Sequence, residues 1–355
     1  MILLGSTGSI GVNALYIAKQ YDLNVEVLVA GRNIELLSKQ VVEFSPAIVV
    51  VANKEDVSKV SHPNVLWGEE GILQALENTR SEFVVNALVG FLGLRPTLKA
   101  IELGKHIALA NKESLVAGGA FVDVSKIHPI DSEHFGLWYL LQDKSPIAKM
   151  TITASGGAFR DWPLEKLQTA SLTDALKHPN WSMGQKITID SASMVNKLFE
   201  LLEARWLFGE GEYDAIIEPK SMIHAFIDFK DGSTTAHFAN ADMRLPIAHA
   251  LLKRVETPIL KPVNLLEVGS LEFREIKTER YPIWEIKDDV LANPERGVVV
   301  NAANEAAIEM FVKSEIGFLD ISRQIIRAYN HFDVVASSVD DIFEIDNAVR
   351  AFVRS

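Results

Sequence analysis

The segment GSTGSIG, residues 5–11, is the first pattern in the chain with a chemical meaning. It follows a short apolar run and precedes a helical pattern, and Gly5, Gly8 and Gly11 allow a tight turn and a close approach of backbone to ligand. Free N–H groups at the start of a helix attract anions such as a pyrophosphate. The spacing is G-x-x-G-x-x-G, not G-x-G-x-x-G. We nevertheless predict a dinucleotide-binding loop, because a plain tight turn does not require three glycines.

The residues after the second apolar run indicate which dinucleotide binds. NAD enzymes have an acidic residue there for the ribose 2′-hydroxyl, whereas an arginine accommodates the 2′-phosphate of NADP. The chain has Gly31, Arg32 and Asn33 at this point. This favours NADPH, and a solvated surface arginine is the alternative interpretation.

Acidic residues in two parts of the chain have the spacing of a site for a hard cation. Asp131 and Glu133 are two residues apart, so in an extended segment both side chains project from the same side. Asn196 and Glu200 are one helical turn apart, with Lys197 beside them. Three carboxylates, from Asp131, Glu133 and Glu200, would form an oxygen-only site that suits Mg²⁺ or Mn²⁺. The alternative is two ordinary solvated acidic segments.

Residues 155–185 form a long segment rich in Gly, Pro and Trp with little periodicity, and we predict a flexible lid there. Ser155 precedes two glycines, which favours an anion-binding turn. His178 can donate a charged hydrogen bond, although a lone histidine is also often structural. Lys112 follows a predicted strand at the edge where open α/β sheets bind ligands, so it is a candidate to stabilise an oxyanion, or else a surface lysine.

The first third of the chain has the pattern of strands alternating with helices. Non-alternating apolar runs are typical of parallel strands covered on both faces, so we predict an α/β fold with a doubly wound, Rossmann-like parallel sheet. The predicted strands are residues 1–4, 25–30, 47–51, 83–85 and 107–110, and the predicted helices between them include 12–20 and 34–44.

From about Ile130 the pattern becomes mixed. Strands at 148–153, 186–189, 223–229 and 233–239, and a helix over 192–207 capped by Asp190 or Ser191, predict a central α+β catalytic domain with a mixed sheet. Asp231-Gly232 is a hairpin turn signal. Glu203 and Arg205 on the helix are expected to be solvated. Helical spacing at 294–313, 320–330 and 339–353, with a capping box from Ser338 to Asp341, predicts a C-terminal helical bundle.

These changes of pattern divide the chain into four parts. They are the sheet region with the glycine loop, the mixed α+β region with the predicted lid, a linker and a helical tail, with boundaries 1–130, 131–254, 255–280 and 281–355.

Composition narrows the class of protein. The 355 residues carry a net charge of −12 and include no cysteine. A negative field repels phosphate backbones, which argues against a nucleic-acid binder. The lack of cysteine excludes thiol nucleophiles, zinc–thiolate sites and iron–sulfur clusters. No apolar stretch reaches the ~18 residues that span a bilayer, and the N-terminus lacks the features of a signal peptide, so we expect a cytoplasmic protein that binds no membrane.

Seven motifs, in their order, resemble those of the 1-deoxy-D-xylulose 5-phosphate reductoisomerases. They are GSTGSIG, LANKESLV, PIDSEH, SGGAF, HPNWSMG, DSASMVNK and VVVNAANEAA, and they cover nearly the whole chain. The resemblance implies a homodimer that uses NADPH and a divalent metal to rearrange and reduce 1-deoxy-D-xylulose 5-phosphate to 2-C-methyl-D-erythritol 4-phosphate, in the non-mevalonate route to isoprenoid precursors. The physiological metal, Mg²⁺, Mn²⁺ or Co²⁺, and the choice between retro-aldol and α-ketol chemistry stay open.

By the same resemblance, the first part would be an NADPH-binding domain, the second a metal-binding catalytic domain with the lid, and the last a C-terminal α-helical domain. The resemblance also assigns site residues. NADPH would contact Thr7, Gly8, Ser9, Ile10, Gly31, Arg32, Asn33, Asn111, Glu113 and Gly184. The metal ligands would be Asp131, Glu133 and Glu200, which together with Lys112 would be the catalytic residues. The phosphorylated ketose would contact Lys112, Ser132, Glu133, Ser155, His178, Ser191, Asn196, Lys197 and Glu200, with Ser155, Ser191, Asn196 and Lys197 facing its phosphate.

Two other classes of protein share part of this pattern. A simple NADP-dependent dehydrogenase of an amino-acid semialdehyde or a homoserine-like alcohol has the glycine loop but needs no three carboxylates beside a phosphate cluster. Semialdehyde enzymes that acylate a cysteine are excluded, because the chain has none. A cofactor-sensing regulator would bind NADPH and reduce nothing. Metal-dependent turnover separates these alternatives from the family.

Overall fold

The computed structural model of the protein describes residues 1–141, 146–252 and 254–355. Its contacts divide the chain into two compact units. The first unit contains Met1–Ser114, Val122–Asp131 and Asp242–Leu260, and the second contains Leu115–Phe121, Ser132–Ala241 and Lys261–Ser355. The four domains with the boundaries given above stay a prediction.

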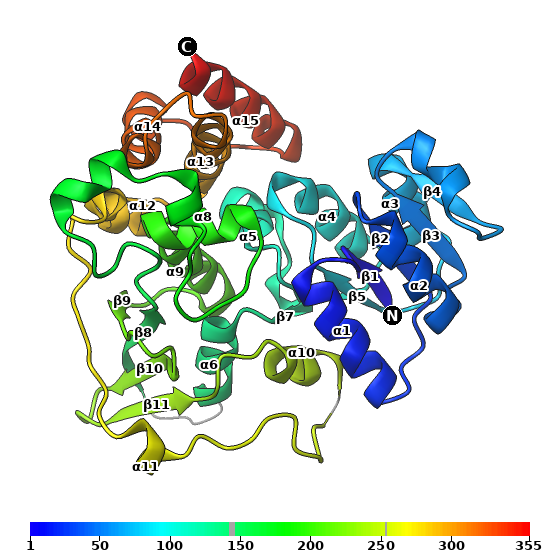
Figure 1. Ribbon diagram of the computed structural model, residues 1–355, viewed down its shortest axis with the longest axis horizontal. Coiled ribbons are helices and arrows are strands. Elements are labelled where there is room, and N and C mark those ends of the chain that lie inside the picture. Colours follow the sequence, from blue (N-terminus) through cyan, green and yellow to red (C-terminus); the bar gives the residue numbers. More distant parts are fainter. Residues whose placement is uncertain (142–145, 253) are drawn as a thin grey trace. The chain divides into compact units, whose positions relative to one another are not determined.

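The first unit is built on a seven-stranded parallel sheet with the order β4-β3-β2-β1-β5-β6-β7 (Figure 1). Its strands are β1 (Ile2–Leu4), β2 (Val27–Ala30), β3 (Ile48–Val51), β4 (Val65–Trp67), β5 (Phe83–Asn86), β6 (His106–Leu109) and β7 (Ile127–Pro129). Every residue of β1, β2 and β3 is buried, as expected of apolar runs in a sheet covered on both faces. The predicted doubly wound sheet is confirmed.

Two strands of this seven-stranded sheet lie outside the predicted set, and they are its two edges. Both β4 and β7 are three residues long and partly exposed, and β7 contains Pro129. An edge strand needs no continuous apolar run, and proline is tolerated there, so the signal used for the inner strands is absent.

The order of the strands creates a point where ligands bind in this kind of fold. From β1 the chain runs outward through β2, β3 and β4 and then returns to β5 on the other side of β1. Ligands of open α/β sheets bind at such a reversal, outside the carboxyl ends of the strands. The glycine loop lies here, between β1 and α1. The helices of this unit are α1 (Ser9–Gln20), α2 (Ile34–Phe44), α3 (Gly68–Glu77), α4 (Leu94–Glu102) and α10 (Arg244–Leu251), and α5 (Lys112–Gly118) follows β6.

The second unit contains a four-stranded mixed sheet with the order β11-β10-β8-β9. Its strands are β8 (Ile147–Ala154), β9 (Tyr213–Ile217), β10 (Ile223–Phe229) and β11 (Thr234–Phe238). β8 and β9 are parallel, and β10 is antiparallel to both β8 and β11. The Asp231-Gly232 hairpin is confirmed, and Gly232 has the positive φ, +89°, that such a turn requires.

The segment after the predicted lid differs from the prediction. Residues 186–189 are not a strand: they belong to α8 (Gln185–Ser193), and α9 (Val195–Phe208) follows after Met194. Asp190 and Ser191 therefore lie inside α8 and do not cap the next helix. Alternation over four residues is too short to define a strand, and the buried Ile189 and Ala192 are three apart, which is helical spacing. Met194 has φ +70°, so the backbone turns sharply between the two helices.

The C-terminal part of this unit is helical, as predicted. Figure 1 shows α13 (Gly297–Val312), α14 (Phe318–His331) and α15 (Val339–Arg354) beside one another, and α13 packs against both other helices. The capping box between Ser338 and Asp341 is confirmed. The remaining helices of the unit are α6 (Ser132–Leu140), α7 (Leu172–Ala175), α11 (Leu265–Val268) and α12 (Lys287–Ala292). Among the residues that the structure describes, no helix combines the length and apolar character needed to cross a membrane.

Candidate active site

The glycine loop has the backbone geometry of an anion-binding turn. Gly5 has φ +91°, and a Cβ added there would lie 2.5 Å from the carbonyl oxygen of Ala87. A Cβ on Gly11 would lie 2.2 Å from the carbonyl oxygen of Gly5. Gly8 caps α1, and Gly8 and Ser9 are exposed, whereas Thr7 and Ile10 are partly buried. With no acidic residue in the first turn of α1, this loop fits a pyrophosphate.

Gly31, Arg32 and Asn33 follow β2, the strand beside β1, and all three are exposed. Because the carboxyl ends of neighbouring parallel strands meet at one edge of the sheet, Arg32 and the glycine loop share that edge. Asn33 also caps α2, because its Oδ1 accepts a hydrogen bond from the Leu36 N–H at 3.1 Å. This arrangement fits a nucleotide with a 2′-phosphate.

The residues after β6 form a buried polar group. The side-chain amide of Asn111 donates to the carbonyl oxygens of Leu88 and Gly90, at 2.9 and 2.7 Å, and to Glu113 at 3.2 Å. Asn111 therefore holds the loop after β5, a structural role that the sequence did not suggest. Lys112 donates to Asp131, with 2.5 Å between Nζ and Oδ2. The structure thus brings a predicted catalytic lysine and a predicted metal ligand into direct contact.

In the second unit, two predicted metal ligands converge. Glu133 lies at the start of α6 and Glu200 on α9, and their carboxylates have oxygens within 4.8 Å of each other. Lys197 is ion-paired with both, at 2.8 Å from Glu133. Burial of Lys197 would lower its pKa, but the two carboxylates outweigh that effect and raise it. Two carboxylates whose hard oxygen donors converge on one positive charge, here the Lys197 ammonium, also fit Mg²⁺ or Mn²⁺.

The neighbours of these carboxylates hold them in place. Asn196 donates from Nδ2 to Glu200 at 2.5 Å, and Ser132 donates from Oγ to Glu133 at 2.5 Å. Asp131 ends the Val122–Asp131 segment of the first unit and is joined directly to Ser132, the first residue of α6.

Three residues assigned to the substrate phosphate or its surroundings meet in the second unit. His178 Nε2 lies 2.9 Å from Ser155 Oγ and 3.1 Å from Ser191 Oγ. Its Nδ1 accepts a hydrogen bond from the Trp181 N–H at 2.9 Å, so the proton of the imidazole is on Nε2. Burial, with the charge of Arg160, lowers the pKa of His178 to about 4. The histidine is a neutral donor toward the two hydroxyls, which corrects the prediction of a charged one.

The backbone beside this cluster requires glycine. Gly156 and Gly157 have φ +87° and +67°, and a Cβ on Gly157 would lie 2.5 Å from the carbonyl oxygen of Ser191. Gly184 caps α8.

The segment predicted as a lid, residues 155–185, contains α7 and a short 3₁₀ segment, Leu164–Thr169. The closure of a lid stays a prediction.

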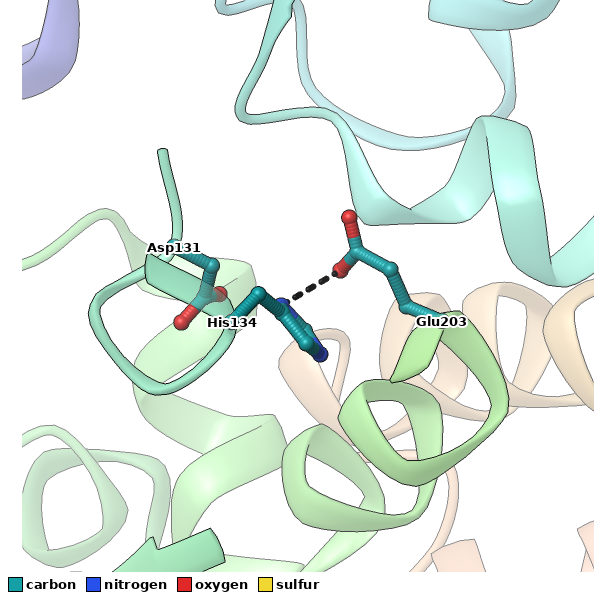
Figure 2. A group of neighbouring side chains, drawn as sticks. All are labelled: Asp131, His134 and Glu203. Carbon is teal, nitrogen blue, oxygen red and sulfur yellow. Dashed lines mark ion pairs between the residues drawn. The ribbon is translucent and has the colours of Figure 1, made fainter. Parts of the chain in front are cut away.

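One expected surface residue is buried. Glu203, predicted to be solvated, is 1% exposed and lies 3.3 Å from Nδ1 of the fully buried His134. Figure 2 shows the two side chains facing each other. The sequence contained a signal for the burial of Glu203, because residue 203 follows Glu200 by one helical turn and lies on the same face of α9. The partner that makes burial possible is far away in sequence, and no local pattern identifies it.

The chain is similar to known proteins along nearly its whole length. A family model described as 1-deoxy-D-xylulose 5-phosphate reductoisomerase matches residues 1–119, and models of the C-terminal domains of the same enzymes match 127–208 and 238–352. A curated 1-deoxy-D-xylulose 5-phosphate reductoisomerase from Nautilia profundicola is 59% identical, over 100% of this chain and 99% of its own. The relative from Wolinella succinogenes is 54% identical with the same coverage.

The chain belongs to the 1-deoxy-D-xylulose 5-phosphate reductoisomerase family.

Solved structures of reductoisomerases have the same fold. A crystal structure of DOX-P reductoisomerase in complex with NADPH, fosmidomycin and magnesium matches with a TM-score of 0.91 at 31% identity, covering 99% of this chain and 97% of that one. The Zymomonas mobilis reductoisomerase in complex with NADPH matches with a TM-score of 0.88 at 32% identity and the same coverage. Membership in this family of NADP-dependent enzymes sets aside both the simple dehydrogenase and the regulator considered above.

Proposed function

We propose that the protein rearranges and reduces 1-deoxy-D-xylulose 5-phosphate to 2-C-methyl-D-erythritol 4-phosphate, using NADPH and Mg²⁺ or Mn²⁺. The observation that carries the proposal is the convergence of the Glu133 and Glu200 carboxylates on the buried ammonium group of Lys197, in a chain of this family. Relatives with a similar fold bind NADPH and magnesium, which supports the choice of cofactors.

Asp131, Glu133 and Glu200 would hold the metal. When bound, such an ion supplies Lewis-acid stabilisation for adjacent oxygens of a ketose. The oxygen-only chemistry of the three side chains and the short covalent path from Asp131 to Glu133 support this set. Lys112, in contact with Asp131, would bind the oxygen on which negative charge develops during the carbon-skeleton rearrangement.

The phosphate of the substrate would bind among Ser155, Ser191, Asn196 and Lys197, with His178 as a neutral donor between the two serines. The proton on His178 Nε2 and the hydroxyls of both serines can all be donated to a phosphate oxygen. Ser132, beside Glu133, would contact the substrate near the metal. Because the chain carries a net charge of −12, these local donors and Lys197 have to supply the attraction for an anionic substrate.

NADPH would bind at the carboxyl edge of the parallel sheet. Its pyrophosphate would contact Thr7, Gly8, Ser9 and Ile10, and its 2′-phosphate would contact Gly31, Arg32 and Asn33. The geometry of the glycine loop and the exposure of Arg32 support these contacts. Asn111, Glu113 and Gly184 complete the proposed set.

The wider setting is also part of the proposal. We assign the reaction to the non-mevalonate route to isoprenoid precursors, in the cytoplasm where NADPH is available, by a homodimer. Analytical ultracentrifugation of the purified chain tests the dimer directly, and a monomer at micromolar concentration would contradict it.

An assay with and without metal tests the central claim. NADPH absorbance should fall only when both 1-deoxy-D-xylulose 5-phosphate and Mg²⁺ or Mn²⁺ are present, and product analysis should identify 2-C-methyl-D-erythritol 4-phosphate. Equal rates in EDTA would reject the metal role. NADPH oxidation with a simple aldehyde, but not with the ketose phosphate, would favour a dehydrogenase.

A further inference from the structure

A buried histidine–glutamate pair joins the two helices that carry converging carboxylates. His134 on α6 is fully buried, and Glu203 on α9 is 1% exposed. Nδ1 of the imidazole lies 3.3 Å from Oε2 of Glu203 (Figure 2). Burying such polar groups costs free energy unless they are paired, so this contact has to be made when the two helices pack.

The other nitrogen of the same ring also contacts α9. Nε2 of His134 lies 2.7 Å from the backbone carbonyl oxygen of Glu200. A carbonyl oxygen only accepts, so Nε2 carries a proton and donates it. The imidazole therefore spans the gap between α6 and α9 with one contact at Glu200 and one at Glu203, a helical turn further on.

The position of this bridge in the sequence connects it to the carboxylates. His134 directly follows Glu133, and the carbonyl that it binds is that of Glu200 itself. A shift of the imidazole relative to α9 therefore moves Glu133 relative to Glu200. Metal affinity depends on such outer contacts, because they fix where the ligand atoms lie.

We propose that Glu203, acting through His134, is a positioning residue that sets the separation of Glu133 and Glu200 and so the affinity for a divalent cation. The inference rests on the proposed function only in taking these two carboxylates as metal ligands. The inference adds that metal affinity depends on the reach of the Glu203 side chain, by which we mean that the side chain is long enough to extend from α9 to the imidazole.

Two substitutions separate reach from charge. Glu203→Gln keeps the length of the side chain and loses its charge, and its amide can donate to Nδ1 of an imidazole protonated on Nε2. Glu203→Asp keeps the charge and shortens the side chain by one methylene, so it no longer meets the ring without a shift of α6 toward α9. Glu210 follows α9 and is 93% exposed, so Glu210→Gln and Glu210→Asp are matched controls.

The experiment measures binding of Mn²⁺ alone to the full chain, with free Mn²⁺ counted by electron paramagnetic resonance. We expect Glu203→Gln to stay within about threefold of the unsubstituted protein and Glu203→Asp to bind about tenfold or more weakly, in the range found for outer contacts of metal sites. Both Glu210 variants should bind Mn²⁺ normally. Thermal unfolding of each variant establishes that it is folded at the temperature of the measurement.

A kinetic readout separates positioning from a general loss of structure. In Glu203→Asp the Mg²⁺ concentration for half-maximal rate should rise by a similar factor, while the KM for NADPH stays unchanged. If Glu203→Asp does not fold, Glu203→Gln still tests the inference, because a large loss of Mn²⁺ affinity in that variant would mean that charge matters and would overturn it.

Several outcomes would overturn the inference. The reverse order, with Glu203→Gln weak and Glu203→Asp normal, would mean that charge is what matters. Equal loss in both, or none in either, would show that reach has no part. If the unsubstituted chain does not bind Mn²⁺, the proposed metal site fails, and that result is distinct from normal binding that is insensitive to Glu203.

Discussion

Replacing Lys197 with methionine tests how the two carboxylates share a cation. The Lys197 ammonium lies 2.8 Å from Glu133 and is also paired with Glu200, and its side chain is 5% exposed. Methionine has a similar length and no charge, so Lys197→Met removes the cation with little change in packing. Two carboxylates would then face each other in a buried environment without their shared partner.

The size of the effect follows from this burial. Removing one partner of a buried ion pair costs about 3–5 kcal/mol, because the remaining charge is left uncompensated. For a domain of 150–250 residues, 1 kcal/mol corresponds to a Tm change of roughly 2–4 °C. A loss of about 3 kcal/mol therefore lowers the Tm of the second unit by about 6–12 °C in EDTA.

A divalent cation should reverse this loss. An ion present at a hundred times its Kd stabilises the folded state by about 2.7 kcal/mol. In Lys197→Met the ion meets two uncompensated carboxylates, whereas in the unsubstituted protein it has to displace an ammonium group from them. Mn²⁺ should therefore raise the Tm of the variant more than that of the unsubstituted chain.

Thermal unfolding followed by tryptophan fluorescence is the assay, because every tryptophan except Trp67 belongs to the second unit. Lys177→Met is the control: Lys177 is 68% exposed and paired with Asp174, so its loss should leave the Tm nearly unchanged. A Tm in EDTA equal to that of the unsubstituted protein would refute the reasoning. So would an equal rise with Mn²⁺ in both proteins.

Three further predictions follow from the geometry. Arg32→Asp should lower the ratio of kcat/KM for NADPH over NADH by about tenfold or more, and an unchanged ratio would contradict the role of Arg32 at the 2′-phosphate. Gly157→Ala, at φ +67° and against Ser191, should lower the Tm and raise the KM for the ketose phosphate, whereas Gly232→Ala, at φ +89° with open space around it, should leave that KM unchanged. Because the pKa of His178 is about 4 when folded and about 6.5 when unfolded, its contribution to stability is present above pH 6.5 and is lost as the pH falls to 4. Because His178 is partly exposed, this loss of unfolding free energy is limited to about 1 kcal/mol. In His178→Gln, the corresponding fall of the Tm between pH 6.5 and pH 4 should be absent.

The sequence predicts the inner part of the fold well, for a physical reason. Strands β1, β2 and β3 are buried on both faces, so their composition alone identifies them. The edge strands β4 and β7 are partly exposed and carry no such signal. The strand predicted at residues 186–189 is wrong. Four residues that alternate between polar and apolar are compatible with both the strand period and the helical period, and only the packing of the following residues distinguishes the two.

The candidate site is predictable in its residue types but not in its pairings. The motifs predict the types of the metal ligands, which stays a prediction, and single out two serines and a histidine that the structure brings together, Ser155, His178 and Ser191. The neutral state of His178 depends on burial and on the Trp181 N–H, neither of which a motif contains. The burial of Glu203 depends on His134, a contact between distant segments that only the folded chain forms.

The sharp turn at Met194 restricts how the length of this chain can vary. Successive residues of an α-helix are rotated by about 100°, so one residue inserted or deleted between α8 and α9 would rotate all of α9 about its axis relative to α8. Lys197, Glu200 and Glu203 would then face a different direction from Ser191. Natural or engineered variants with altered length should therefore carry their insertions elsewhere, for example in the irregular segment around α11, where no helix register is at stake.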